Sequence, residues 1–307
     1  MVMNKYIISY TAGYIDGDGC FCMGQYISTK GIISWDISIQ VCSVKVESLT
    51  FFKKHFGGSI RSKPKRPYHK QIFAWKIRGI ASYKLSIEMQ KFLTDKRLQC
   101  LQYIEMRERI VPNNFKKVHE VEQDIRNRIM EELKEDKHVN YLVTKEIIER
   151  IKDIDTIAPI KEDWAYLAGL IDAEGCFRIK KWKPVNKPNY VYAICLEIGN
   201  TRYPMFEFLM ERFGGNICYV PPKKIKRASA IWSISSFALS QIITNILPYI
   251  IIKKAAAEKI IEFYNTTLSN GGDRHSQEFK ESYARKLIER EKIVDEIHNL
   301  NLKGLKV

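Results

Sequence analysis

The sequence lacks the features that mark several common protein classes. Its seven cysteines are odd in number and form neither a CxxC pair nor a Cys/His spacing that would bind zinc. The longest apolar run, residues 246–252, contains Pro248 and is too short to span a bilayer, and the first residues show no secretory signal. We therefore expect no disulfide framework, zinc site or membrane partner, and we expect free thiols in a reducing, intracellular compartment.

Acidic side chains are in the minority. The chain of 307 residues has 35 Asp and Glu against 50 Lys and Arg, and its formal net charge is +15. This excess favours a polyanionic partner, and nucleic acid is the leading candidate. On charge alone, a solvated basic surface or an attraction to membranes is the alternative.

One segment of the chain occurs twice. Thr11-Ala-Gly-Tyr-Ile-Asp-Gly-Asp-Gly-Cys-Phe21 returns as Leu167-Ala-Gly-Leu-Ile-Asp-Ala-Glu-Gly-Cys-Phe177. Further along, Phe56-Gly-Gly returns as Phe213-Gly-Gly, a spacing of 157 residues (213 − 56). A period this long indicates two duplicated domains that meet about a pseudo-twofold axis, and it excludes a solenoid of short repeats.

Each copy is predicted to fold as an α-β-β-α-β-β-α-α module, which gives an α+β fold of two pseudo-symmetric halves. Helices are expected over residues 6–18 and 164–174, the second with Asp163 as its N-cap. Strands with alternating apolar and polar residues follow each of them. The predicted domains are a first repeat (1–105), a charged helical linker (106–160), a second repeat (161–265) and a helical tail (266–307).

The repeated segments carry small residues at helical spacing, Gly13 and Gly169 among them. Helices with such a stripe can pack closely across the pseudo-twofold axis, at the interface of the two domains. Asp18 and Glu174 would then meet at converging helix C-termini, where two carboxylates repel each other unless a cation lies between them. Mg²⁺ suits such an oxygen-only site.

Beside a DNA phosphate, such ions could activate a water and stabilise a leaving oxygen, which is the two-metal logic of phosphodiester hydrolysis. Asp16 and Asp172 lie on another face of each helix, where capping or packing fits at least as well. The alternative interpretation of the whole motif is a helix-packing device whose acids are merely solvated.

The two segments resemble the paired motifs of the LAGLIDADG homing endonucleases, in the single-chain, two-repeat form. The resemblance implies saddle-like four-stranded antiparallel sheets and a monomeric, metal-dependent nuclease that cuts a long asymmetric DNA site and leaves short 3′ overhangs. It places the metals, Mg²⁺ with Mn²⁺ as a substitute, on Asp18 and Glu174, with the carbonyls of Gly17 and Ala173 as additional ligands. Leucines of the motif are replaced by Thr11 and Tyr14, and Glu174 replaces its final Asp.

The family also places a basic residue near each scissile phosphate, and Lys96 and Lys253 match this position in the two copies (253 − 96 = 157). Such a lysine would order the water network or stabilise charge on the phosphate. An ordinary exposed lysine is the alternative. Ser43 and Asn200, near the ends of the second strands, are weaker candidates for the same solvent pocket.

The strand face opposite the apolar one is expected to read DNA, because an antiparallel ribbon fits the major groove. Basic loops between the strands of each hairpin would contact phosphates, with a solvated turn as the alternative. In the first copy the predicted DNA-binding residues are Cys22, Gly24, Tyr26, Ser28, Ser34, Asp36, Ser38, Gln40, Arg61, Lys63, Lys65, Arg66, Lys70, Ile72, Lys76 and Arg78. In the second they are Arg178, Lys180, Trp182, Cys195, Glu197, Cys218, Val220, Lys223, Lys224, Arg227, Ser229 and Ser233.

The two sets of outward residues differ almost everywhere, so a non-palindromic site is expected. Two other functions fit the same scaffold: a maturase that binds its host intron RNA, and a catalytically inactive DNA-binding regulator. Retention of acids in both motifs favours the nuclease. The abundance of Ile, Lys and Asn suggests AT-rich coding DNA, as in a chloroplast, a mitochondrion or a bacterium.

Overall fold

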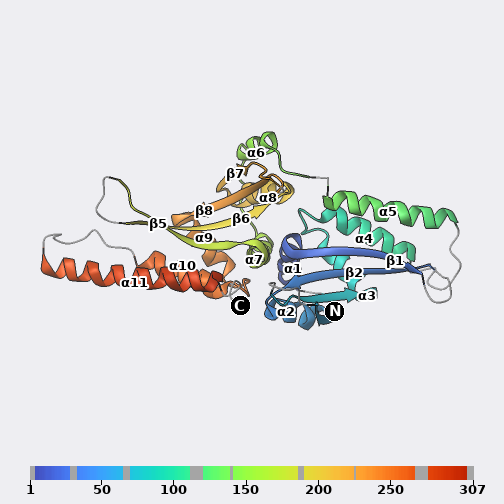
Figure 1. Ribbon diagram of the computed structural model, residues 1–307, viewed down its shortest axis with the longest axis horizontal. Coiled ribbons are helices and arrows are strands. Elements are labelled where there is room, and N and C mark those ends of the chain that lie inside the picture. The colour runs from blue at the N-terminus through green and yellow to red at the C-terminus, as the bar shows by residue number, and fades with distance from the viewer. Residues whose placement is uncertain are drawn as a thin grey trace.

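The protein consists of two modules that lie side by side, each with one antiparallel sheet and its own helices (Figure 1). The structure is a computed structural model, which describes residues 4–27, 33–64, 70–110, 120–138, 141–185, 190–224, 226–266 and 276–302. Helices α1 (Lys5–Asp18) and α7 (Lys161–Glu174) carry the repeated motif and pack against each other where the modules meet.

The first module continues with β1 (Gly19–Ile27), β2 (Ile33–Ser43), α2 (Val46–Phe56), β3 (Ser59–Ser62), β4 (Phe73–Arg78), α3 (Gly79–Met89) and α4 (Arg97–Ile110). The second continues with β5 (Cys176–Trp182), β6 (Val191–Asn200), α8 (Pro204–Phe213), β7 (Asn216–Val220), β8 (Ser229–Ser235), α9 (Ser236–Ile246) and α10 (Lys254–Asn265). The strand orders, β1-β2-β4-β3 and β5-β6-β8-β7, are equivalent. The predicted pair of α-β-β-α-β-β-α-α modules is confirmed.

Three further helices lie outside this repeat. In the range predicted as a linker, α5 (Glu120–His138) packs on α4, and α6 (Lys145–Lys152) packs on α8 and β7. In the tail, α11 (Gln277–Leu302) packs on α10 and β5. Because α5 and α11 begin 157 residues apart (277 − 120), they occupy equivalent places, one beside each module. No helix in the described part of the chain is long and apolar enough to cross a membrane.

The repeated Phe-Gly-Gly segment has a specific structural role in each module. Trp75 and Trp232 are fully buried under their sheets, and the indole Nε1 of each donates a hydrogen bond to the first glycine of the segment, at 2.8 Å for Gly57 and 2.7 Å for Gly214. The next residue, Gly58, has φ +82°, a conformation that a side chain would strain. The segment therefore ends a helix and closes a turn over the buried indole.

Direct backbone contact between α1 and α7 confirms the predicted close packing of the motif helices. A Cβ added to Gly13 would lie 2.0 Å from the carbonyl oxygen of Tyr166, and one added to Gly169 would lie 1.9 Å from that of Tyr10. Only glycine fits at either position. The two contacts are related by the pseudo-twofold axis and fix both the distance between the helices and their register.

The prediction of Asp163 as an N-cap is wrong. Helix α7 begins at Lys161 with Ile160 at the N-cap position, so Asp163 is its third residue. From there its carboxylate accepts a hydrogen bond of 2.9 Å from the backbone N–H of Ile160. An acid at the third position of a helix can accept a hydrogen bond from the backbone N–H of the N-cap residue, so such an acid marks a helix that begins two residues before it.

We predict that Gly13→Ala destabilises the protein by about 1–3 kcal/mol, since the new methyl group overpacks a backbone contact. Gly24→Ala is the matched control, because its added Cβ would meet no atom nearer than 4.0 Å. It should change the free energy of unfolding by less than about 0.5 kcal/mol. Urea unfolding of the two variants checks this, and equal stabilities would show that the helices are not in backbone contact.

Candidate active site

The last residues of the two motif helices, Asp18 and Glu174, come together at the junction of the modules. A Cβ added to Gly17 would lie 2.5 Å from Cβ of Ala173 and 3.1 Å from Cγ of Glu174, so the two helix ends touch. Both acids are solvent-accessible. Two effects raise the pKa of Asp18 to about 6: first the loss of water around its carboxyl group to the surrounding protein, and then the negative charge of Glu174. The predicted convergence of the two acids is what the structure shows.

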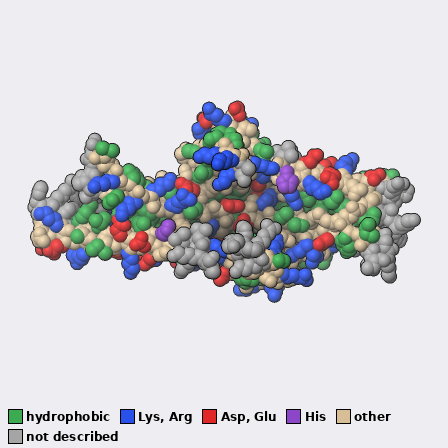
Figure 2. Space-filling model, in the orientation of Figure 1, with side chains coloured by type: hydrophobic (Ala, Val, Ile, Leu, Met, Phe, Trp, Pro, Cys, Tyr) green, Lys and Arg blue, Asp and Glu red, His purple; other side chains and the backbone are tan. Residues whose placement is uncertain are grey.

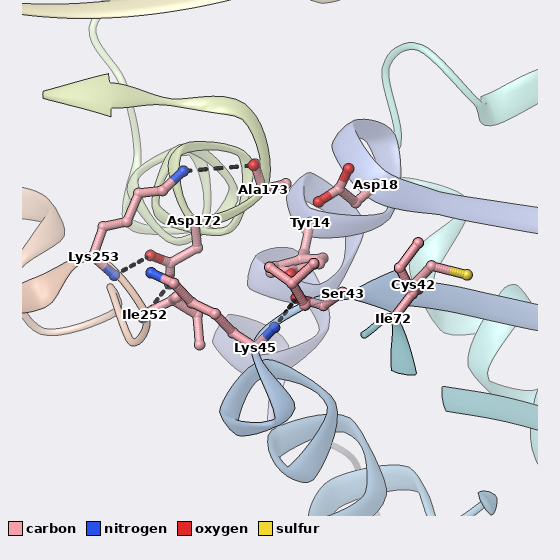
Figure 3. A pocket seen from close by; sticks show the side chains of 11 residues that line it. Tyr14, Asp18, Cys42, Ser43, Lys45, Ile72, Asp172, Ala173, Ile252 and Lys253 are labelled. Atoms are coloured by element: carbon pink, nitrogen blue, oxygen red, sulfur yellow. Dashed lines mark hydrogen bonds between the residues drawn. The ribbon is translucent and has the colours of Figure 1, made fainter. Parts of the chain in front are cut away.

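A cavity of about 350 Å³ opens beside Asp18 (Figure 3). Both modules line it: Ser43 and Lys45 come from the turn after β2, and Ala173 and Lys253 come from the second module. The cavity beside Asp18 therefore combines two lysines and a serine with apolar side chains such as Val44 and Ile252.

Lys96 and Lys253 hold the C-terminal ends of the motif helices. The ammonium group of Lys96 donates to the carbonyl oxygens of residues 15, 16, 17 and 19 at 2.8–3.0 Å. That of Lys253 donates to the carbonyls of residues 171, 173 and 175 at 2.7, 3.5 and 2.7 Å. Both lysines are half-buried, whereas their neighbours Arg97 and Lys254 are exposed. The interpretation of the pair as ordinary surface lysines is therefore wrong.

Asp16 and Asp172 are buried structural acids. Asp16 accepts hydrogen bonds from the backbone N–H groups of residues 94–96, and Asp172 does the same for residues 251–253. Each also accepts from a tyrosine of the other module: Tyr166 donates to Asp16 at 2.6 Å and Tyr10 donates to Asp172 at 2.8 Å. These acids thus cap the segment that carries the lysine of their own module and bind the opposite motif helix.

The tyrosine pair was missed in the sequence, although its signal is present. Tyr10 and Tyr166 stand 156 residues apart (166 − 10), the same spacing as Asp16 and Asp172 (172 − 16). A tyrosine at the same position of both copies is a common core residue, so the repeat alone does not indicate a bond between modules.

Ser43 and Asn200 form equivalent turns at the ends of β2 and β6. The hydroxyl of Ser43 accepts a hydrogen bond of 3.0 Å from the N–H of Lys45, and Oδ1 of Asn200 accepts one of 3.1 Å from the N–H of Arg202. Such side-chain turns fix the direction of the chain two residues on. Each turn therefore places a basic residue, Lys45 or Arg202, that the sequence interpretation did not single out.

Strand register places those predicted DNA-binding residues that lie within the strands on one face of each sheet. Ser38 pairs with Cys22 and Arg78, and Cys195 pairs with Arg178, so these residues share a face as expected. Ser38 and Cys195 themselves are buried, at 0% and 3% exposure, and cannot reach a duplex. Their prediction is wrong because short side chains on an inner strand are covered by longer neighbours. Ser28, Lys65 and Arg66 lie outside the described residues.

One carboxylate on each sheet face binds two cations. Asp36 pairs with Lys76 at 2.8 Å and with Arg78 at 2.7 Å, and the Arg78 hydrogen bond is the main cause that lowers the pKa of Asp36 to about 2. On the other sheet Glu197 pairs with Lys180 at 2.9 Å and Arg178 at 3.3 Å. Lys and Arg side chains occur over both modules on the face drawn in Figure 2.

Residues 167–268 match the family model of the LAGLIDADG endonucleases. The second module is therefore similar to that family over these residues. The resemblance drawn from the sequence is thereby confirmed, and no curated protein matches the chain in sequence.

Several solved structures share the whole LAGLIDADG architecture. The I-SmaMI LAGLIDADG homing endonuclease bound to cleaved DNA is 18% identical, with a TM-score of 0.63 over 95% of this chain and 96% of that one. The LAGLIDADG meganuclease I-AabMI bound to uncleaved DNA is 14% identical, with a TM-score of 0.61 over 95% and 98%. I-GzeII in complex with its DNA target is 14% identical, with a TM-score of 0.59 over 93% and 97%. Both modules therefore share one fold with these proteins.

The ends of α1 and α7 offer the donors that a hard divalent cation prefers. The carboxylates of Asp18 and Glu174 repel each other, and oxygen is the donor that such a cation takes. In the part of the chain described, no group of three or more His, Cys, Asp or Glu residues could hold a metal. The carbonyls of Gly17 and Ala173, predicted as further ligands, accept hydrogen bonds from Lys96 and Lys253, which leaves each oxygen one lone pair.

We predict that Tyr166→Phe lowers the free energy of unfolding by about 1–3 kcal/mol, because it leaves the buried Asp16 short of a donor. Tyr83→Phe is the control: its hydroxyl also donates to a carboxylate, that of Glu108, but at the surface. The control should cost less than about 0.5 kcal/mol. Chemical denaturation measures the free energy of unfolding of both variants. If Tyr166→Phe is as stable as the control, the hydrogen bond from Tyr166 to Asp16 does not stabilise the contact between the modules.

Proposed function

We propose that the protein is a site-specific DNA endonuclease that hydrolyses both strands of a long, asymmetric duplex site and leaves short 3′ overhangs. The convergence of Asp18 and Glu174 at the touching ends of α1 and α7 carries this proposal. The LAGLIDADG endonuclease model that matches the second module and the DNA-bound structures of the same fold support it. The single chain supplies both motifs, so a monomer suffices.

Asp18 and Glu174 would hold divalent cations, Mg²⁺ with Mn²⁺ as a substitute. When bound, such a cation supplies an activated water and stabilises charge on the phosphate oxygens. The chain's own residues hold this centre in place: Lys96 and Lys253 bind the carbonyls at the helix ends, and Asp16 and Asp172 hold those lysines' segments. Rigid support of this kind keeps reacting groups in register.

The outward sheet faces would read the duplex through their side chains. Arg78 and Lys76 on one sheet, and Arg178 and Lys180 on the other, are pre-ordered by a shared carboxylate. The exposed loop residues Lys223, Lys224 and Arg227 are suited to phosphates. Equivalent positions differ between the sheets, so the two half-sites would differ in sequence.

The alternatives, an intron RNA-binding maturase and a catalytically inactive regulator, are not favoured. Neither function requires two acids at one point between the modules. The solved structures of this fold named above are bound to DNA.

We predict that the wild-type protein cuts plasmids from a randomised target library in the presence of Mg²⁺ and not in EDTA. Asp18→Asn and Glu174→Gln should each abolish double-strand cleavage, since each removes a carboxylate from the shared centre, and both should still bind DNA in a gel-shift assay. Glu88→Gln, an exposed acid on α3, is the control and should cut normally. Unchanged cleavage by either acid variant would remove that residue from the mechanism.

A second prediction concerns the cation and does not depend on activity. Mg²⁺ should raise the melting temperature of the wild-type protein, because a ligand that binds only the folded state stabilises it. The rise should vanish in the Asp18→Asn, Glu174→Gln double variant. In EDTA at pH 7.5 the Asp18→Asn variant should melt above wild type, because one of two repelling charges is gone. Differential scanning fluorimetry measures both effects, and an equal Mg²⁺ response of wild type and double variant would place the cation elsewhere.

A further inference from the structure

Two basic residues occupy equivalent positions in the two modules but have different surroundings. Lys45 and Arg202 stand 157 residues apart (202 − 45), each two residues after the turn-forming side chain, Ser43 or Asn200. In a symmetric centre both would present a positive charge to the phosphate beside the acid of their own half.

Arg202 is withdrawn into a buried ion cluster. Its guanidinium Nε donates to Oδ1 of Asp95 at 2.8 Å and its Nη2 donates to the Asp95 carbonyl at 3.1 Å. Its Nη1 donates to the Asp136 carbonyl, and the Asp136 carboxylate lies 3.8 Å away. The ring of Tyr141 covers the guanidinium at 5.3 Å, and the Arg202 side chain is 8% exposed. Every face of this cation is therefore occupied by protein.

Lys45 lines the open cavity beside Asp18 and Lys253. Its side chain reaches from its turn toward the side of the cavity formed by Asp172 and Lys253 (Figure 3). The Asp172 carboxylate already binds three N–H groups and the Tyr10 hydroxyl. Within the described ranges no carboxylate lies within 4.0 Å of the Lys45 ammonium, which leaves this cation available to an anion.

The difference follows from the residues that replace the partners of Arg202. Position 252, equivalent to Asp95 (252 − 95 = 157), is Ile252, which lines the cavity. Position 293, equivalent to Asp136 (293 − 136 = 157), is the buried Ile293 of α11. One half thus has two carboxylates around its cation, and the equivalent positions of the other half carry two isoleucines.

We infer that Lys45 contacts the scissile phosphate of one DNA strand only, and that the other strand has no equivalent cation because Arg202 is committed to Asp95 and Asp136. The inference rests on the proposed endonuclease function. A cation beside the phosphate stabilises charge that develops there during cleavage. Loss of Lys45 therefore slows the cleavage of one strand, so that the enzyme nicks the duplex instead of cutting both strands.

The test is a strand-resolved cleavage assay under single-turnover conditions with Mg²⁺. The probe is a duplex that carries the site recovered from the randomised library, with a different fluorophore on each strand. We expect Lys45→Met to slow one strand at least about tenfold and the other less than about twofold, so that nicked duplex accumulates. Lys45→Arg, which keeps the charge, should restore most of the lost rate. Lys54→Met, an exposed lysine of α2, is the control and should leave both rates unchanged.

The possible outcomes distinguish a failure of the Lys45 inference from a failure of the endonuclease proposal. If wild type cuts no duplex, the endonuclease proposal fails. If wild type cuts and Lys45→Met slows both strands equally, or neither, the inference is overturned and the endonuclease stands. Melting curves and DNA binding in EDTA accompany each variant, and Lys45→Gln is the second test if Lys45→Met does not fold.

Discussion

The contact of backbone with backbone between α1 and α7 is the constraint on which the rest of the molecule depends. Gly13 and Gly169 each lie against a carbonyl of the opposite helix, with no room for a methyl group. Because the contacts are symmetric, the C-terminal ends of both helices lie together. Asp18 and Glu174, the last residues of these helices, therefore lie close to each other. Tyr10 and Tyr166 strengthen the same junction from its two sides by hydrogen bonds to buried acids.

This junction places unfavourable charges together. The C-terminal end of each helix already carries a partial negative charge, and the carboxylates add to it, which contributes to the raised pKa of Asp18. Lys96 and Lys253 offset part of this charge through the carbonyls rather than through the carboxylates. The acids therefore keep their attraction for a cation while the helix ends are held. Local strain retained at a site that other contacts stabilise is typical of functional centres.

Much of this arrangement could be predicted from the sequence because the chain is duplicated. The repeated small residues predict the helix contact, and the repeated terminal acid predicts the centre. Strand alternation gives the correct sheet face, but it does not show that Ser38 and Cys195 are covered by their neighbours. Contacts between residues far apart in sequence carry no periodic signal. The bonds of Arg202 to Asp95 and Asp136 are of this kind, and the replacement of both acids by isoleucines breaks the symmetry that the repeat suggests.

In this structure the two modules would share one cation centre at the end of their touching helices. A crystal structure of the protein with its DNA target and Mn²⁺, with anomalous scattering recorded at the manganese edge, tests it most directly. We expect manganese peaks bound by carboxylate oxygens of both Asp18 and Glu174. Manganese bound away from these two residues, or carboxylates that point to opposite sides of the molecule, would contradict it.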